Sequence, residues 1–270
     1  MPTPLPEFER PPVDEMVMGI QFDPLPNFHA AQFGLFWTRI REEYPHTEDQ
    51  APLIPAVEPA EIRPSSPSVS VTALAAPPLS RCWFLNEDKT ELIQVQRDRF
   101  LRNWRQIKGN EPYPRFSRLA RDFQRAWNEF LTFAGDQGLG SVKVNQCELA
   151  YINYIEKEAG WSELGELHGV FPFLRSREQG SFLPPAETLC WQAKYRLPES
   201  RGRLHIEMSP AFRGRDMRLV LSFALTAGGA PAEDSWEQIA AWFNLSHEWI
   251  VRAFAELTSS AAHQLWGKKS

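Results

Sequence analysis

The stretch RCWFLNEDKTELIQVQRDRFLRNWRQIKGNEPYPRFSRLARDFQRAWNEFLTF, residues 81–133, decides the fold class. Two runs of β-forming residues, 81–85 and 92–96, flank the polar segment 86–90, which predicts a β-hairpin. The pattern allows the second strand of this hairpin to continue to Trp104.

A helix is expected directly after these strands. Over residues 116–133 the apolar side chains recur at helical spacing, as Leu119, Phe123, Ala126, Trp127, Phe130 and Leu131. A long helix that follows a hairpin, instead of alternating with single strands, is typical of an α+β protein with a mostly antiparallel sheet.

The same criteria, alternation for strands and a 3.6-residue period for helices, predict the remaining elements. Strands are expected at residues 13–22, 68–74, 142–155, 188–197, 204–209 and 217–226. Helical segments are expected at 29–44, 161–168 and 235–267, the last with a kink near 244–246. Turn-forming residues between the late strands lie at 198–202 and 210–215.

The order of these elements is the same in both parts of the chain. Residues 1–140 and residues 141–270 each predict strand, helix, three strands and a long helix, a β-α-β-β-β-α unit. We therefore expect a duplicated unit whose halves form one continuous domain, with a curved, mostly antiparallel sheet and the long helices on one face. Residues 45–78 contain eight of the 23 prolines and predict an extended connection within the first half.

Composition excludes several classes of protein. The 270 residues carry a net charge of −5, so no global field draws the chain to nucleic acid or to an anionic membrane. Three widely spaced cysteines exclude a disulfide scaffold and favour a reducing cytoplasm. The N-terminus has no signal-peptide pattern, and no apolar run is long enough to cross a bilayer.

The densest charged feature follows the hairpin. Residues 94–105 hold four arginines interleaved with aromatic residues, and residues 81–125 carry a net charge of +5, whereas residues 1–61 carry −8. One interpretation is a face that binds an anionic ligand or nucleic acid. The other is an intramolecular match between the acidic first strand and helix and this basic strand, or a strand edge protected by charge. The candidate residues are Arg97, Arg99, Arg102, Trp104 and Arg105.

A second candidate group lies on the strand 142–155. Alternation places Gln146 and Glu148 on one face, and Asn145 on the other with Tyr151 and Asn153. Polar groups on both faces of a central strand need partners, and Arg97 or Arg99 is the expected partner of Glu148. The group is either the wall of a polar cavity or a buried hydrogen-bond network that fixes the register of the sheet.

No catalytic or metal-binding motif is present. The six histidines are scattered, with none at ligand spacing, and Cys147 has no local partner that would make it a nucleophile. We therefore predict no metal, no cofactor and no catalytic residue.

The sequence resembles a sporadically distributed bacterial family of about this length that has no established activity. Motifs spread over nearly the whole chain carry the resemblance: RPPVDEMVMGIQFDPL at 10–25, RCWF at 81–84, QVQRDRF at 94–100, YPR at 113–115, NQ at 145–146, YIN at 151–153 and LWG at 265–267. The patchy distribution implies an accessory role, such as defence or toxin control, by association only.

Three functional hypotheses follow. The first is a non-enzymatic cytoplasmic binding protein that presents the arginine-rich strand to a protein partner, with nucleic acid as the alternative partner and no membrane association. The second is a small-ligand or enzymatic pocket between the two halves, lined by Asn145, Gln146, Glu148 and the arginines. The third is a self-associating structural protein whose tryptophans form the interface.

Overall fold

The structure is a computed structural model that describes residues 4–54, 58, 79–174, 182, 184, 186–214 and 217–269. Its strands are β1 Val13–Phe22, β2 His46–Gln50, β3 Arg81–Leu85, β4 Glu91–Gln96, β5 Arg99–Arg105, β6 Val144–Ile155, β7 Trp191–Arg196, β8 Arg203–Arg213 and β9 Arg218–Gly229. Its α-helices are α1 Ala30–Ile40, α2 Phe116–Asp136, α3 Trp236–Leu257 and α4 Ser260–Leu265, and its short 3-10 helices are η1 Lys157–Ala159, η2 Leu164–Gly169 and η3 Pro198–Ser200.

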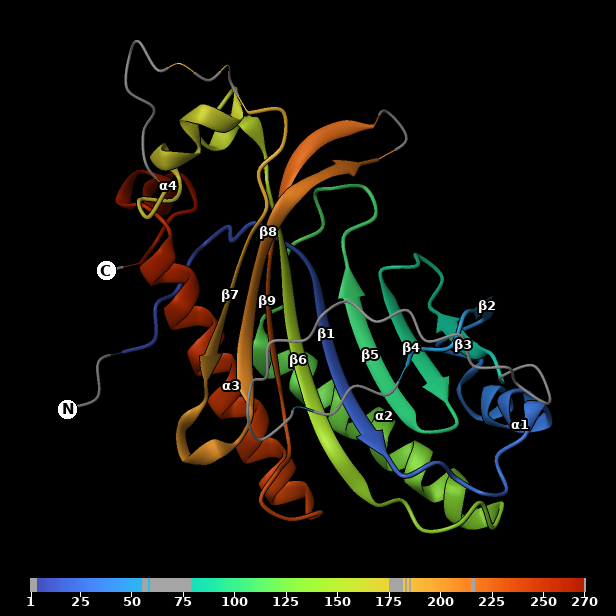
Figure 1. Cartoon of the computed structure of the whole chain (residues 1–270). Coiled ribbons are helices and arrows are strands. Elements are labelled where there is room, and N and C mark those ends of the chain that lie inside the picture. The colour runs from blue at the N-terminus through green and yellow to red at the C-terminus, as the bar shows by residue number, and fades with distance from the viewer. Residues whose placement is uncertain are drawn as a thin grey trace.

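All nine strands form one open antiparallel sheet in the order β2-β3-β4-β5-β1-β6-β9-β8-β7 (Figure 1). The α+β class and the antiparallel sheet are therefore confirmed. The central pair is β1 and β6, which remain in register from Glu15 opposite Ile152 to Gln21 opposite Gln146. Strands from before and after residue 140 thus meet in one continuous sheet.

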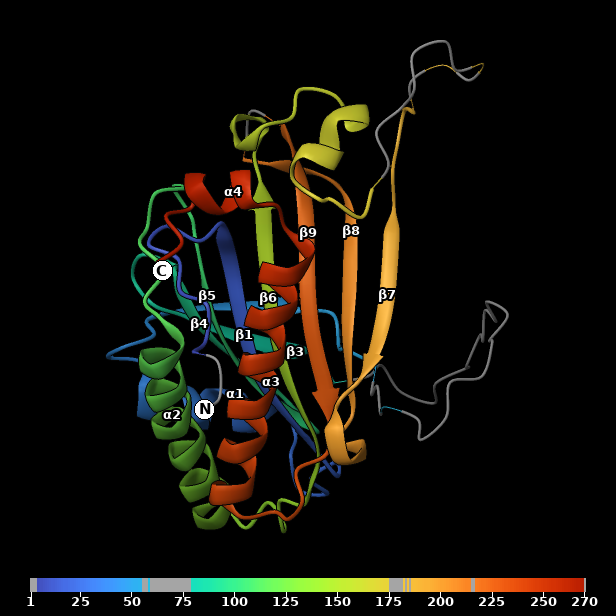
Figure 2. The same cartoon turned by 90° about the vertical axis from the view of Figure 1, so that its left-hand side faces the viewer.

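The two long helices cover one face of this sheet (Figure 2). The apolar stripe of α2 lies against the sheet, with Phe130 in ring contact with Phe22 on β1 and Phe100 on β5, and with Phe36 on α1. The tryptophans at 37, 127, 236 and 249 also pack into or against this core. The aromatic excess of the sequence is therefore largely accounted for by packing between helices and sheet. The opposite face of the sheet, toward the viewer in Figure 1, carries no α-helix of the described chain, and we call it the open face.

Two details of the first half differ from the sequence prediction. β2 lies inside the predicted connection 45–78 and pairs with β3, an interaction that local composition cannot reveal. β4 does not continue to Trp104, because a two-residue turn at Arg97 and Asp98 begins β5, with Gln96 paired to Arg99. The turn contains neither Gly nor Asn, so its sequence gave no signal. The predicted strand 68–74 lies outside the described residues.

The second half differs in two places. β8 continues through Pro210, where the sequence predicted a turn. β7 pairs with β8 only from Arg203 to Met208, so beyond Met208 β8 is an edge strand. Pro210 lies in this edge segment, where the missing backbone N–H costs no hydrogen bond. The predicted kink near 244–246 is wrong. Since no Pro or Gly interrupts it there, α3 runs to Leu257, and a new helix begins after the N-cap Ser259.

The two ends of the chain lie together beside α3 and α4 (Figure 1). The Glu9 amide donates to the Gly267 carbonyl at 2.9 Å, and the Lys269 amide donates to the Glu7 carbonyl at 2.8 Å. The Phe8 ring packs edge-on against Phe254 of α3 and near Trp266. The N-terminal arm, which is the segment of residues 4–12 before β1, is thus held across the helix side of the molecule.

Candidate binding face of the sheet

The arginines of the basic strand do not form one patch. Alternation along β5 places Arg99 and Arg105 on the open face with Leu101 and Asn103, whereas Phe100, Arg102 and Trp104 face the helices. Arg97 lies in the turn, where its Nε donates to the Leu25 carbonyl at 3.1 Å. The expectation that one surface presents all four arginines is therefore corrected by the alternation of the strand itself.

Arg102 belongs to a closed ionic network on the helix side. Its side chain is only 3 % exposed and pairs with Glu91 and, at 3.7 Å, with Asp122 of α2. Tyr44 Oη accepts a further hydrogen bond from Arg102 Nε at 3.4 Å. Trp104 is also buried, beside Tyr113. These two residues link the sheet to the helices and are not available to a partner.

Arg105 lies near one end of the open face. Its guanidinium sits over the Trp83 ring, 5.4 Å from the centroid, and Arg81 lies over the same ring at 5.5 Å. Arg105 Nε donates to the Lys89 carbonyl at 3.1 Å. Asn145, near the start of β6, instead donates to Asp23 Oδ1 at 3.0 Å, and alternation directs it away from the face that carries Gln146 and Glu148.

Three of the predicted residues do meet in the middle of the open face. Arg99, Gln146 and Glu148 lie on neighbouring strands and line the same small depression together with Gln21 and Gly19. Arg99 donates to Gln21, which lies opposite it on β1. The space that they enclose is about 10 Å³, far below the roughly 300–1,000 Å³ of small-molecule sites. These residues thus form a closed surface of side chains and not the deep pocket of the second hypothesis.

The charge on this surface is mixed. Burial raises the pKa of Glu148, and the nearby Arg99 and His205 lower it by attraction. Glu148 and Arg99 therefore line the same depression and attract each other, but among the described residues they form no direct ion pair.

Residues of the chain's own connection lie on this open face. The Leu53 amide donates to Gln96 Oε1 at 2.8 Å, and Gln96 Nε2 donates back to the Leu53 carbonyl at 2.9 Å. The Leu53 side chain packs on a small apolar cluster formed by Val17, Leu101 and Ala150 of three adjacent strands. Gln96 therefore binds the backbone of Leu53, while β5, β1 and β6 contact its side chain.

Glu58 makes a second contact with the same face, nearer its other edge. Its amide donates to Gln146 Oε1 at 2.8 Å, and its carboxylate lies 3.2 Å from Arg203 Nη1 and contacts His205 Nε2. Both Arg203 and His205 are on β8, and alternation directs them to the open face. The Glu58 carboxylate is thus bound by a guanidinium and an imidazole, and the Glu58 backbone amide by the side chain of Gln146.

Sequence reasoning missed Gln96, Arg203, His205 and Glu58. The spacing of Arg203 and His205 places them on one face of a strand, but only the sheet order β6-β9-β8 brings them near Gln146. Among the described residues, no group of His, Cys, Asp and Glu converges in a way that could hold a metal ion. No helix in the described part of the chain is long and apolar enough to cross a bilayer.

Comparisons with protein-family models, curated proteins and solved structures give no match to this chain.

Proposed function

We propose that this chain is a binding protein whose open sheet face holds an extended, acidic segment of a partner polypeptide. The observation that carries the proposal is the way in which the face holds Leu53 and Glu58 of its own connection. It supplies an apolar cluster for one side chain, a pair of hydrogen bonds to its backbone, and a guanidinium and an imidazole for a carboxylate five residues further along. A partner with the same pattern would displace the connection by mass action.

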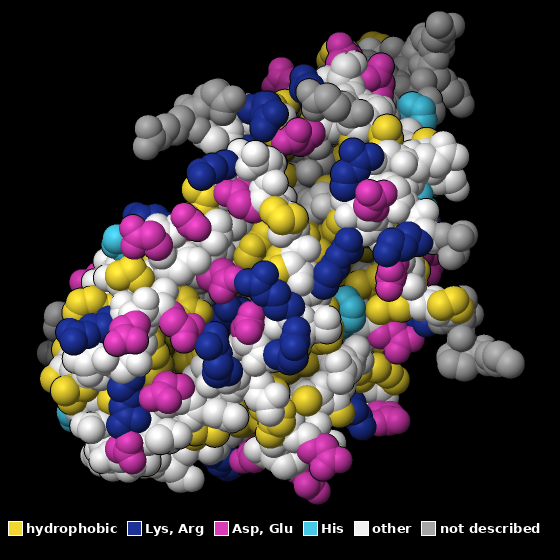
Figure 3. All heavy atoms as spheres, turned by 180° about the vertical axis from the view of Figure 1, so that it is seen from behind, with side chains coloured by type: hydrophobic (Ala, Val, Ile, Leu, Met, Phe, Trp, Pro, Cys, Tyr) yellow, Lys and Arg dark blue, Asp and Glu magenta, His cyan; other side chains and the backbone are white. Residues whose placement is uncertain are grey.

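A polypeptide fits this face better than a nucleic acid. Gln96 pairs with both the amide and the carbonyl of one residue, which recognises a peptide backbone and no feature of a phosphodiester. Arg99 lies near the carboxylate of Glu148, so the face has no uniform positive field. The helix side in Figure 3 likewise intersperses dark blue and magenta side chains.

The cellular role and the history of the fold belong to the same proposal. We infer a cytoplasmic accessory protein of a bacterial defence or toxin-control system from the resemblance of its motifs, with the partner encoded in that system. The sheet order supports descent of the two halves from one duplicated unit. β1 and β6 lie side by side at the centre, and the later strands of each half extend outward from them as β5-β4-β3 and β9-β8-β7.

Direct binding of a synthetic peptide tests this function. A fluorescein-labelled peptide of residues 48–61, EDQAPLIPAVEPAE, is titrated against a chain in which residues 51–78 are replaced by a glycine–serine linker of equal length. Saturable binding followed by anisotropy is expected. Peptides carrying Leu53→Ser or Glu58→Gln should each bind about tenfold more weakly, because each loses one anchoring contact.

Matched controls separate this face from general electrostatic attraction. Gln96→Leu in the chain should weaken binding, whereas Arg121→Gln, which removes a cation from the exposed side of α2, should not. A result in which both peptides and both chain variants bind as the parent does would exclude the proposal.

Light scattering of the intact chain tests the third hypothesis, since a dimer that dissociates with Gln96→Leu would make a second copy the partner. Tight binding of a single-stranded oligonucleotide, competitive with the peptide, would instead identify nucleic acid as the ligand.

A further inference from the structure

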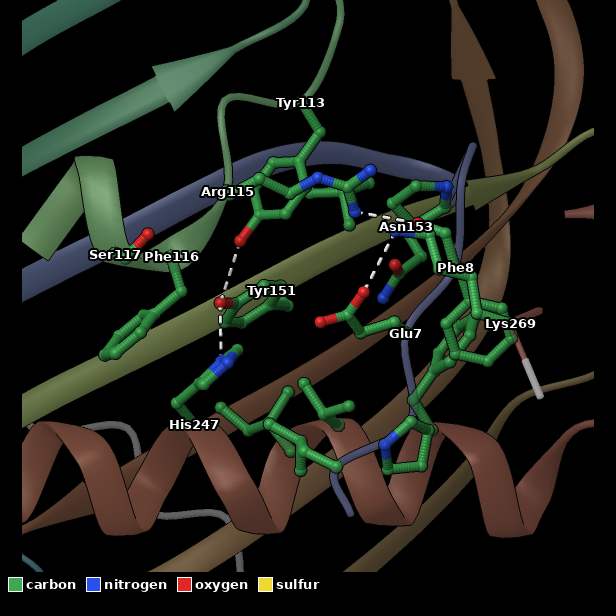
Figure 4. A pocket seen from close by; sticks show the side chains of 17 residues that line it. Glu7, Phe8, Tyr113, Arg115, Phe116, Ser117, Tyr151, Asn153, His247 and Lys269 are labelled. Atoms are coloured by element: carbon green, nitrogen blue, oxygen red, sulfur yellow. Dashed lines mark hydrogen bonds and ion pairs between the residues drawn. The ribbon is translucent and has the colours of Figure 1, made fainter. Parts of the chain in front are cut away.

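A cavity of about 480 Å³ lies on the helix side of the sheet, away from the open face (Figure 4). Its walls are the start of α2, the middle of α3, strands β1 and β6, and the N-terminal arm described above. This volume lies within the range of small-molecule sites, which is roughly 300–1,000 Å³. Most of its lining side chains are apolar, among them Phe8, Val13, Phe116 and Ile250.

One wall of the cavity carries a chain of three hydrogen-bonded polar groups (Figure 4). Tyr113 Oη lies 3.0 Å from Tyr151 Oη, and Tyr151 Oη lies 2.9 Å from His247 Nδ1. The His247 ring is stacked on Phe116 with a centroid distance of 4.0 Å and an interplanar angle of 5°. Three elements that are distant in sequence, the loop before α2, β6 and α3, thus converge on one polar strip.

These three groups are uncharged near neutral pH. Burial lowers the pKa of His247 to about 4 and raises the pKa of both tyrosines. The direction of the hydrogen bonds is set by the His247 tautomer, so the chain can run either way. In one direction Tyr113 is left to donate, and in the other to accept.

The charged side chains that line the cavity already have partners. Arg115 donates to the carbonyls of Phe8 at 2.7 Å and Glu9 at 3.1 Å, and Lys269 lies 3.1 Å from Glu7. Arg115 has a φ of 72°, in the left-handed region that is costly for a residue with a side chain. The Arg115 guanidinium lies over the Tyr113 ring, 5.9 Å from its centroid. A charged ligand would therefore have to displace the carbonyls that hold Arg115 or break the Lys269–Glu7 ion pair to find a counter-charge.

We infer that this cavity binds an uncharged, largely apolar small organic molecule that presents one hydroxyl or carbonyl group to the Tyr113–Tyr151–His247 chain. The apolar walls take the body of the molecule. The reversible hydrogen-bond chain serves either a donor or an acceptor. This site is separate from the peptide-binding face, because Tyr151 and Gln146 project from opposite faces of β6.

A neutral fluorescent dye tests the inference on the full-length protein. N-phenyl-1-naphthylamine should bind with saturation at one site per chain. Val251→Trp fills the cavity and should weaken this binding at least tenfold. Ala253→Trp is the matched control, because Ala253 lies two residues away on α3 and lines a separate groove of about 270 Å³ with Trp249 and Leu257. That variant should bind the dye as the parent does.

The polar strip is tested by competition. 1-Naphthol should displace the dye several-fold better than naphthalene does, since it adds one hydrogen bond, and Tyr113→Phe should abolish this advantage. Circular dichroism verifies the fold of each variant, and Val251→Phe replaces Val251→Trp if the larger side chain prevents folding. Dye binding that is non-saturable, or that is lost in Ala253→Trp and kept in the Val251 variant, would overturn the inference. So would a naphthol advantage that survives Tyr113→Phe.

Discussion

At the scale of single residues, two half-buried titratable groups, His247 and Glu148, should affect stability in opposite directions of pH. His247 is stacked on Phe116 and has its pKa lowered by burial from 6.5 to about 4. Between these two values the unfolded chain binds a proton that the folded chain excludes, so stability falls as the pH falls from 6.5 toward 4. The full effect is about 3 kcal/mol.

His247→Gln should remove this part of the pH dependence, because glutamine does not titrate and can still accept from Tyr151. Urea unfolding of parent and variant at pH 7.5 and pH 4.5 measures the difference. The parent should lose about 2 kcal/mol more than the variant on acidification. Equal losses in the two proteins would show that His247 is protonated in the folded state.

Glu148 makes the opposite contribution to the pH dependence of stability. Burial raises the pKa of Glu148 by more than the attraction of Arg99 lowers it. Between the ordinary and the raised pKa, the folded chain therefore retains a proton that the unfolded chain has released. Its contribution to stability is therefore lost as the pH rises from the ordinary glutamate pKa through the raised one. Glu148→Gln should increase the melting temperature at pH 8 relative to the parent and change it little at pH 4. Glu207→Gln, at an exposed position of β8, is the control and should show no such trend. A melting temperature lowered by Glu148→Gln at pH 8 would contradict this account.

At the scale of elements, the packing of α2 on the sheet gives a direct test of the core. Phe130 is fully buried and in ring contact with Phe22, Phe36 and Phe100. Phe130→Ala should cost about 3–5 kcal/mol of unfolding free energy. Leu131→Ala, at the next position and 37 % exposed, should cost far less, on the order of 0.5 kcal/mol. Similar losses in denaturant unfolding would mean that the helix does not pack through this stripe.

The sequence predicted the strands and helices better than it predicted which face of the sheet a side chain lies on or which residues it contacts. β1 and β3 were predicted at their observed bounds, because alternation and breaking residues are local signals. The arginines of β5 were grouped by density, although their spacing alone separates Arg102 from Arg99 and Arg105. Arg203, His205 and His247 could not be assigned a role, because their partners come from elements more than 95 residues away or from the other half of the chain. Register and sheet order, which bring such residues together, are set by long-range packing.

At the scale of the whole molecule, the halves share one sheet and one aromatic core. The central β1–β6 pair joins them, so neither half can unfold without exposing the apolar face of the other. We expect a single unfolding transition, coincident by near-UV and far-UV circular dichroism. Two separated transitions would show that residues 1–140 and 141–270 fold as independent units.

The central claim, recognition of an acidic peptide by the open face, is tested most directly by one double-mutant cycle. The peptide of residues 48–61 and its Glu58→Gln form are each titrated against the linker-replaced chain and against its Arg203→Gln variant. The account predicts that Glu58→Gln weakens binding about tenfold against the parent face and much less against the variant, because the variant has already lost the ion pair between Glu58 and Arg203 and keeps only the His205 contact. Equal weakening against both proteins would show that Glu58 and Arg203 do not meet in the complex, and would contradict the account.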